Sequence, residues 1–265
     1  MSIAKTALIG EGVTIREGVI IEDNVIIGDG SYIDYGVVIR ENVTLGKNSF
    51  VGAQSILGEF LFDFHSDNTN KNHPLIIGDN ALLRSGTVIY GDCVIGDNFS
   101  CGHKVTIREC TNIGNNVSVG TLGDIQGRCE LGNYTRLHSN VFIGEHSKIG
   151  NFVWIFPHVV FTNDPTPPSE TLKGIVVDDF ACICARSLVM PGVHIGKDAL
   201  IGACANVTRD IEAEMVAIGN PARVVKNVRE VKDENGQTHY PWRYYFDRGM
   251  PWQGIGYENW IKKDM

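Results

Sequence analysis

The sequence predicts an all-β solenoid built from short strands and tight turns. Every sixth residue is apolar over residues 9–57, then again over 77–155 and 177–207. All 29 of these positions are apolar, whereas average composition would make roughly half of them so. A period of six fits neither a helix nor an alternating strand, but it fits a strand of a few residues followed by a turn.

The residues between the apolar positions are typical of turns. Glycine often follows the apolar residue, as in IGDG, IGDN, IGNN and IGEH. We expect this glycine to free the backbone at the turn, with Asn and Asp tolerating the same conformations. The position four beyond the apolar residue is small or β-branched, as at Val13, Ser31, Ala81 and Thr87. Stacked coils would then bury an aliphatic column, with strands paired roughly 4.8 Å apart.

The bulk composition restricts the classes of partner and compartment. With 265 residues and 43% hydrophobic content, the chain can bury a sizeable core. Its net charge of −8 argues against nucleic acid or an anionic membrane as a general partner. The start MSIAKTALIG lacks the apolar stretch of a signal peptide, and no run of about 18 apolar residues occurs, so we expect a cytoplasmic protein. The seven cysteines form no CxxC pair and are expected to be reduced thiols.

Over residues 3–222 this pattern resembles the hexapeptide-repeat acyltransferases. The resemblance implies a left-handed parallel β-helix with three hexads per coil, assembled as a homotrimer. We therefore expect a β-helix domain over 1–222, with inserted loops at about 58–76 and 162–176. Residues 223–265 are rich in aromatic side chains and are expected to form a C-terminal cap, which would close the solenoid, contact a neighbouring subunit or help to hold a ligand.

Three hexads per coil would stack residues that lie 18 apart. Arg84, His103, His138 and His158 then gather along one edge of the prism. Both loops leave from one corner column, and repeated insertion at one edge often marks the working face of a solenoid. The residues expected along the loop edge are Tyr90, Glu109 and Glu145. In a trimer, an edge of one subunit would face an edge of the next and enclose a cleft.

His103, in the stretch NFSCGHKV, is the candidate catalytic base. Acyl transfer to an amine needs a group that accepts the amine proton, and histidine does so near neutral pH. The acyltransferases also use a turn histidine in this role; the alternative is a surface histidine that only hydrogen-bonds. Asn163 and Asp164 begin the second loop and could orient a histidine or hold the amine, although Asn-Asp-Pro is also ordinary turn chemistry.

Five further side chains are candidates for binding the acceptor substrate. Arg84 could pair with a phosphate, and the loop histidine His65 could contact the substrate. Each also has a purely structural alternative, as a solvent-facing corner charge or a loop anchor. The full set of expected substrate-binding residues is His65, Arg84, Tyr90, Glu109 and His138.

The resemblance implies acetyl-CoA as the acyl donor, bound near the C-terminal coils, and no metal. Small residues there would leave room for the pantetheine arm, or would serve only tight coil packing. Lys197 and Arg223 could meet the phosphates. Residues 218–225 read IGNPARVV and resemble the closing motif of the acyltransferases. The other expected cofactor-binding residues are Ala185, Gly202, Ala203, Ala205, Asn220 and Pro221.

The two loops and the stretch LRSGTVIYGDCVIGDN resemble the bacterial nucleotide-sugar N-acetyltransferases. The resemblance is to those that acetylate dTDP-3-amino-3,6-dideoxyhexoses for surface glycans. An acetyltransferase for a small non-nucleotide acceptor and a non-catalytic β-helix scaffold remain alternatives. A zinc-dependent carbonic anhydrase would need three converging histidines, but Thr121 and Phe156 stand one coil beyond His103 and His138.

Overall fold

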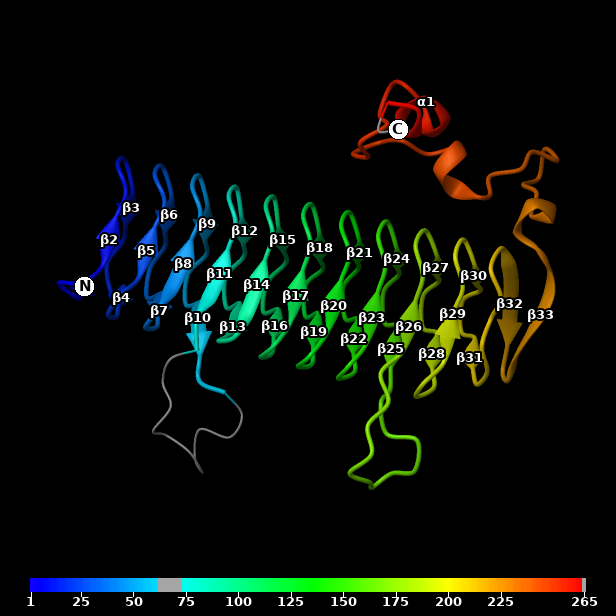
Figure 1. Cartoon of the computed structure of the whole chain (residues 1–265), viewed down its shortest axis with the longest axis horizontal. Helices are drawn as coiled ribbons and strands as arrows, with labels where there is room; N and C mark the ends of the chain where they lie inside the picture. Colours follow the sequence, from blue (N-terminus) through cyan, green and yellow to red (C-terminus); the bar gives the residue numbers. More distant parts are fainter. Residues whose placement is uncertain (62–72, 264–265) are drawn as a thin grey trace.

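The computed structural model describes residues 1–61 and 73–263 and contains a parallel β-helix along most of its length. Three sheets run along the solenoid, and each strand pairs in parallel with the strand one coil away, so Figure 1 shows the coils side by side in sequence order. The predicted left-handed parallel β-helix with two inserted loops and an aromatic-rich C-terminal part is confirmed as the fold class.

Two of the sheets contain only parallel pairs. Sheet A comprises β1 Ser2–Ile3, β4 Ile20–Ile21, β7 Val38–Ile39, β10 Ile56–Glu59, β13 Val88–Tyr90, β16 Thr106–Ile107, β19 Asp124–Ile125, β22 Phe142–Ile143, β25 Val160–Phe161, β28 Leu188–Val189 and β31 Asn206–Val207. Sheet B comprises β2 Leu8–Ile9, β5 Ile26–Ile27, β8 Val43–Leu45, β11 Leu75–Ile77, β14 Cys93–Ile95, β17 Asn112–Ile113, β20 Glu130–Leu131, β23 Lys148–Ile149, β26 Val176–Val177 and β29 His194–Ile195.

The third sheet ends in an antiparallel hairpin. Sheet C comprises β3 Thr14–Ile15, β6 Tyr32–Ile33, β9 Phe50–Val51, β12 Leu82–Leu83, β15 Ser100–Cys101, β18 Ser118–Val119, β21 Arg136–Leu137, β24 Trp154–Ile155, β27 Cys182–Ile183, β30 Leu200–Ile201, β32 Met215–Gly219 and β33 Ala222–Asn227. The segment after it contains η1 Val228–Glu230, η2 Trp242–Tyr244 and α1 Tyr257–Ile261.

Coil stacking follows the predicted 18-residue register. Ser100 pairs with Ser118, which pairs with Arg136, which in turn pairs with Trp154. In the two-residue strands the second residue points inward, so the period-six residues fill the core; Ile107 and Ile125, for example, are fully buried. The small residue four positions later is also buried, as at Ser31 and Thr87. The hexapeptide period is therefore the period of inward-facing positions.

The glycines after the apolar positions have a different role from the one that the sequence suggests. Gly28 and Gly102 do not adopt positive φ. A Cβ on Gly28 would lie 2.5 Å from the Lys47 nitrogen of the next coil, and a Cβ on Gly102 would lie 2.3 Å from the Thr121 nitrogen. The left-handed residue lies two positions later in the turn, as at Gly30 and Asn48. Glycine is thus needed after the strand because backbones approach closely, and not because the chain turns there.

The polar residues of the IGDN and IGNN turns link coils at the corner between sheets B and C. The backbone nitrogen of Asp79 donates to the Asp97 carboxylate at 2.8 Å, and the nitrogen of Asp97 donates to the Asn115 side chain at 2.8 Å. Asn115 donates in the same way to Asn133 at 2.8 Å. A side-chain oxygen from each coil thus satisfies a turn N–H of the previous coil.

Both loops leave from the corner between sheets A and B, as predicted. The first follows β10 and the second follows β25, and both strands belong to sheet A. Figure 1 shows the second loop projecting from the lower edge of the solenoid, at the end of β25.

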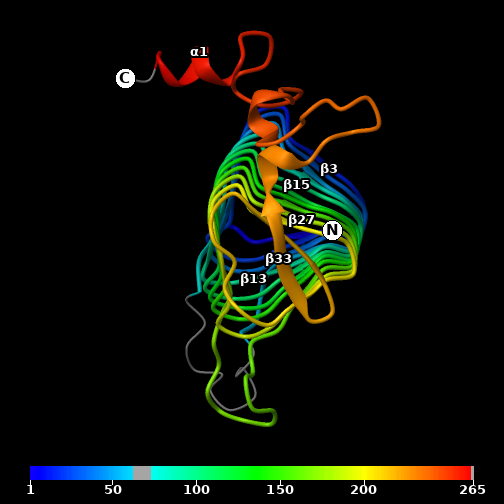
Figure 2. The ribbon, with the colours of Figure 1, turned by 90° about the vertical axis from the view of Figure 1, so that its right-hand side faces the viewer.

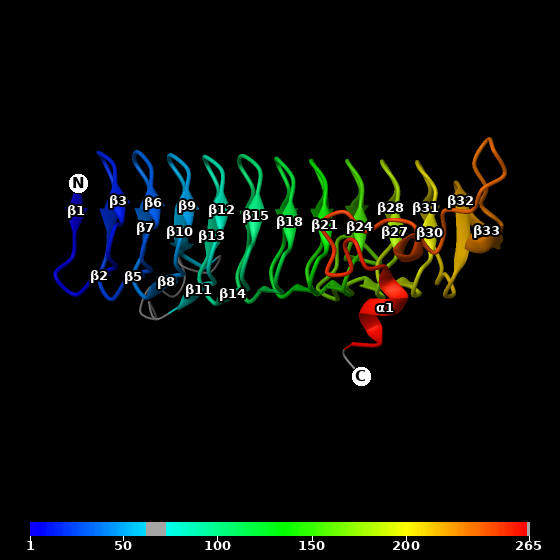
Figure 3. The ribbon, with the colours of Figure 1, turned by 90° about the horizontal axis from the view of Figure 1, so that it is seen from above.

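The C-terminal part divides into a closure and a strap. β33 pairs antiparallel with β32 across the end of the solenoid, as Figure 2 shows from that end. The expected domain boundary at residue 222/223 falls inside this strand. The aromatic strap, residues 228–261, then turns back and lies along the later coils instead of covering the end (Figure 3). It packs on Phe152, Phe180 and Trp154, on sheet C and its corner with sheet B.

A buried ion pair anchors the strap. The Arg243 guanidinium donates to the Asp198 carboxylate, and the two residues are 7% and 4% exposed. The same guanidinium lies over the Phe180 ring, 4.9 Å from its centroid. Beside it, Nε1 of Trp242 donates to the Phe180 carbonyl at 2.8 Å.

Truncation of one inward residue tests the core. We expect Ile107→Ala to lower the free energy of unfolding by about 2–5 kcal/mol, because the fully buried side chain leaves a cavity between closely stacked coils. Thr106→Ala, on the outward side of the same strand, is the matched control and should cost much less. Urea unfolding followed by far-ultraviolet circular dichroism measures both; equal losses would contradict the assignment of the inward column.

Removal of one partner tests the strap anchor. Arg243→Met should destabilise strap docking by about 3–5 kcal/mol, because Asp198 is left as an uncompensated buried charge. Arg229→Met removes an exposed pair with Glu214 and should cost at most about 1 kcal/mol. Denaturation followed by tryptophan fluorescence reports on the strap; indistinguishable variants would argue against the anchor.

Candidate functional site

A hollow of about 620 Å³ lies on the outer face of sheet C, beside its corner with sheet A. Its middle is lined by small residues of two successive coils, Ser100 and Gly102, then Ser118 and Gly120. One wall is formed by Leu82 and Arg84 of the preceding coil. The opposite wall is formed by Arg136, His138 and Trp154.

The hollow follows from the outward residues of successive coils. The strand positions of sheet C that face outward carry Leu82, Ser100, Ser118, Arg136 and Trp154 in that order. Two small side chains between large ones leave a depression, since the backbone beneath them keeps the same coil spacing. The site is therefore encoded by side-chain size along one column of stacked positions.

His103 lies at the rim of the hollow, in the turn that leaves sheet C. Its side chain is exposed, and no described residue hydrogen-bonds its imidazole. Its backbone nitrogen donates to Oγ1 of Thr121 in the next coil at 3.2 Å. The ring thus projects from a turn whose backbone is held by coil stacking. Arg84 and His138 line the same hollow, so three of the predicted site residues are brought together.

In the wall opposite Arg84, the planar groups of Arg136 and His138 each pack on an aromatic ring of the next coil. The His138 ring stacks on Phe156 with centroids 4.8 Å apart and planes 11° apart. The guanidinium carbon of Arg136 lies 5.1 Å from the centroid of the Trp154 ring. The pKa of His138 lies below its ordinary value, chiefly because of burial and also because of the nearby Arg136. A neutral imidazole is therefore favoured there.

The hollow is electropositive on a protein of net charge −8. No Asp or Glu is among its lining residues, and among the described residues no carboxylate lies within ion-pair distance of Arg84 or Arg136. Nη2 of Arg136 donates to the carbonyl of Gly249 in the strap at 3.3 Å. Unpaired guanidinium groups in a concave surface attract anions.

A different corner holds Tyr90 and Glu109, as the loop-edge prediction stated. Glu109 is 5% exposed and pairs with Nη2 of Arg108 at 2.6 Å, while Nη1 of Arg108 donates to Gln126 at 2.9 Å. Burial raises the pKa of Tyr90 and that of the nearby Asp124 carboxyl. This network lies at the corner between sheets A and B, so sheet A separates it from the hollow within one chain.

The predicted catalytic residues of the second loop also lie at the corner between sheets A and B. The Asp164 carboxylate accepts hydrogen bonds from the Thr166 nitrogen at 3.0 Å and from Oγ of Ser169 at 2.7 Å. The Ser169 hydroxyl is the main cause of a lowered Asp164 pKa. Asp164 thus organises its own loop, as in the turn alternative. One chain does not bring Asn163 and Asp164 to His103; His65 lies outside the described residues.

Most of the predicted cofactor residues follow the same corner as His103, further toward the C-terminal end. Ala185, Gly202 and Ala203 lie in turns that leave sheet C, and Ala205 is buried. Asn220 and Pro221 form the turn of the β32–β33 hairpin, where Oδ1 of Asn220 accepts from Asn206 at 3.1 Å, and Arg223 follows on β33. Lys197 is separate: it lies at the corner between sheets B and C, over the Phe180 ring.

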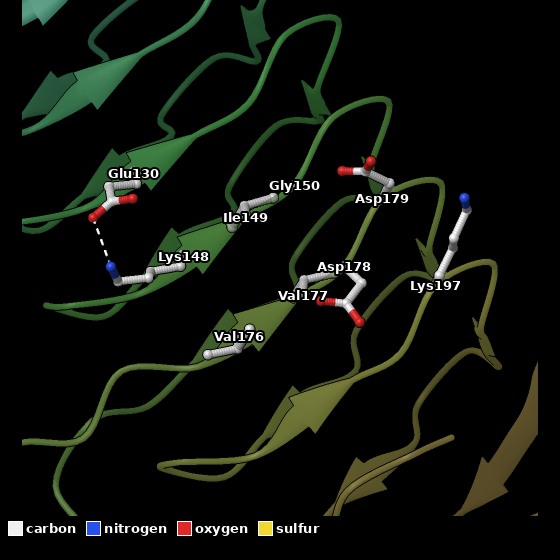
Figure 4. Close-up of a pocket in the computed structure, with 9 residues that line it drawn as sticks. All are labelled: Glu130, Lys148, Ile149, Gly150, Val176, Val177, Asp178, Asp179 and Lys197. Atoms are coloured by element: carbon white, nitrogen blue, oxygen red, sulfur yellow. Dashed lines mark hydrogen bonds and ion pairs between the residues drawn. The ribbon is translucent and has the colours of Figure 1, made fainter. Parts of the chain in front are cut away.

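Lys197 borders a second hollow, of about 430 Å³, on sheet B (Figure 4). Most of its charges are already paired. Lys148 contacts Glu130 at 2.8 Å, and Asp178 contacts His194 at 3.0 Å. Figure 4 shows Lys197 at the far side, away from the Glu130–Lys148 pair. The hollow on sheet C is therefore the better candidate for a site with unsatisfied binding groups.

In residues 1–61 and 73–263, no three or more His, Cys, Asp or Glu side chains are grouped so that they could hold a metal ion. In the same part of the chain, none of the helices combines the length and apolar character needed to cross a membrane.

Sequence reasoning missed Arg136 and Trp154. The signal was present, because both immediately precede a period-six position and are aligned by the 18-residue spacing with Ser100 and Ser118. Reading the outward column as carefully as the corner column would have found the wall of the hollow.

Profiles of known repeats match the first coils. Residues 24–59 match the bacterial transferase hexapeptide (six repeats), and residues 4–35 match the hexapeptide repeat of succinyl-transferase. These segments lie where the structure shows the six-residue register. Residues 4–59 of the chain therefore carry hexapeptide repeats.

Proteins similar to part of this chain include acyltransferases. The 2,3,4,5-tetrahydropyridine-2,6-dicarboxylate N-acetyltransferase of Staphylococcus aureus is 39% identical over 67 residues, which are 25% of this chain and 27% of that protein. The match thus spans about a quarter of the relative's length.

Two solved structures are also similar. The Arabidopsis UDP-N-acetylglucosamine acyltransferase is 19% identical with a TM-score of 0.47, over 85% of this chain and 72% of that one. A Vibrio cholerae hexapeptide-repeat acetyltransferase complexed with acetyl coenzyme A is 23% identical with a TM-score of 0.34, over 37% and 60%.

Titration of His138 tests the electrostatics of the hollow. We expect the NMR titration midpoint of His138 to lie below the ordinary 6.5. In Arg136→Gln the midpoint should rise only partway toward 6.5, because burial remains the larger cause of the lowered pKa. Because the folded state disfavours the imidazolium, the contribution of His138 to the free energy of unfolding should be present above pH 6.5 and fall as the pH drops through the folded midpoint. Arg16→Gln, outside the hollow, should leave the midpoint unchanged; an ordinary midpoint in the wild type would contradict the assignment.

Proposed function

We propose that this protein is an N-acetyltransferase that moves the acetyl group of acetyl-CoA to the amino group of a nucleotide-linked amino sugar. A dTDP-3-amino-3,6-dideoxyhexose destined for surface glycans is the proposed acceptor. The observation that carries the proposal is the electropositive hollow, where His103, Arg84 and His138 converge on a hexapeptide-repeat β-helix.

In the proposed reaction His103 accepts a proton from the attacking amine. The amine nitrogen bonds to the thioester carbonyl carbon, the carbon–sulfur bond then breaks, and the imidazolium returns the proton to the departing thiolate. The exposed ring and the held backbone of His103 suit this role, because the base must reach a substrate without moving the turn. Arg84 would meet an anionic group of the acceptor.

Assembly as a homotrimer is part of the proposal. Within one chain, His103 lies at the corner between sheets C and A, whereas Tyr90, Glu109, Asn163 and Asp164 lie at the corner between sheets A and B. Neighbouring subunits could unite the two corners in one cleft. The turn residues Ala185, Gly202, Ala203, Asn220 and Pro221 would line the pantetheine path along the His103 corner.

A small amine is the second candidate acceptor. The relative from Staphylococcus aureus is named for acetylation of a tetrahydropyridine dicarboxylate, and its carboxylates would also suit the unpaired arginines. A panel of nucleotide-linked amino sugars and small dicarboxylate amines, each with acetyl-CoA, separates these acceptors.

Replacement of the base tests the mechanism. His103→Ala should lower kcat by about 10²-fold or more, since general-base catalysis typically contributes that much. His194→Gln, on sheet B, is the control and should retain activity. Light scattering should show trimers for both variants; full activity in His103→Ala would remove this residue from the mechanism.

A further inference from the structure

The wall formed by Arg136 and His138 offers two planar faces to the hollow. The His138 ring has its other face against Phe156, and the Arg136 guanidinium lies over the Trp154 ring of the next coil. On the side of the hollow, the stacked positions of the previous coil are Ser118 and Gly120, which are too small to cover these faces. A flat ring could therefore lie against the wall, above the small residues.

The surrounding charges suit an anion attached to such a ring. Arg136 uses Nη2 to hold the strap, while no described residue accepts from its Nη1. Arg84 stands across the hollow, and no carboxylate lines the space between them. Planar guanidinium groups stack on aromatic rings and also bind phosphate oxygens, so one wall can serve both parts of a nucleotide.

We propose that the hollow on sheet C is a nucleotide subsite, in which the base stacks on Arg136 and His138 and the phosphates lie between Arg136 and Arg84. This inference rests on the proposed function and names the residues that recognise the nucleotide. Arg136 and His138 are the specificity-determining residues, and the packing of Trp154 and Phe156 against them holds them in position.

The strap makes the subsite dependent on the C-terminal segment. Gly249 fixes the Arg136 guanidinium, and the Phe246 ring meets Trp154 edge-on at 5.6 Å. Because Arg243 anchors the strap near these contacts, strap docking should hold the stacking wall in place. The aromatic segment thus has a role in binding, although it does not enter the hollow as a lining element.

Calorimetric titration without acetyl-CoA tests the subsite separately from catalysis. Wild-type protein should bind dTDP, UDP or adenosine 3′,5′-bisphosphate. Arg136→Lys should lower the affinity for the nucleotide that binds about tenfold or more, because lysine keeps the positive charge but lacks the planar guanidinium. Arg16→Lys is the matched control, since Arg16 stacks on Tyr35 in the same manner but lies outside the hollow, and should bind like the wild type. His138→Phe keeps a flat face and should retain binding, whereas His138→Ala should weaken it.

The outcomes separate the two sources of a nucleotide and the two proposals. If Arg136→Lys lowers the affinity only for dTDP or UDP, the hollow binds the nucleotide of the acceptor. If it lowers the affinity only for the bisphosphate, the hollow binds the nucleotide of coenzyme A. No binding to the wild type, or equal binding by Arg136→Lys with an unchanged thermal midpoint, overturns the subsite. In acetylation assays Arg136→Lys should raise KM with little change in kcat, and failure of every amino sugar to react would refute the proposed function while leaving the binding result intact.

Discussion

Close approach of successive backbones is the constraint on which the rest of the molecule depends. Coils hydrogen-bond along three sheets, with Thr106 nitrogen to Gly123 oxygen at 3.0 Å and Arg108 nitrogen to Ile125 oxygen at 2.9 Å as typical links. Glycine after the strand is required wherever a Cβ would enter the next coil, as at Gly102. This spacing places residues 18 apart directly over one another and converts a linear repeat into columns.

The same constraint explains how a regular solenoid acquires a site. Inward columns are restricted to residues that fit a core of nearly fixed cross-section, which are mostly large aliphatic residues at the period-six positions and small or β-branched ones four positions later. Outward columns are free to vary, and on sheet C two serines between leucine on one side and arginine and tryptophan on the other create the hollow. Chemistry is thus introduced without altering the backbone, since only outward side chains and corner residues change.

The aromatic strap connects distant parts of the chain to that outward surface. It begins beyond the last coil, yet its contacts reach Arg136 and Trp154 in the middle of the solenoid. The buried Arg243–Asp198 pair and the Trp242–Phe180 hydrogen bond hold it against the corner between sheets B and C. Because loss of the contact would leave a buried charge unpaired, the ion pair favours this docked position of the strap.

Counting in sixes along the sequence predicts the repeat, the coil register, the corner from which both loops leave and the meeting of Arg84, His103 and His138, because the backbone is regular. The sequence suggests the wrong reason for the glycines after the strands, and it leaves the course of the C-terminal segment open. Three features emerge only in the folded chain: the strap lies on sheet C, Arg136 and Trp154 form a wall, and Asn163 and Asp164 stand at a different corner from His103. The physical reason is that period-six counting applies only where coils stack, whereas an irregular segment takes its position from side-chain packing and a buried ion pair that no local pattern records.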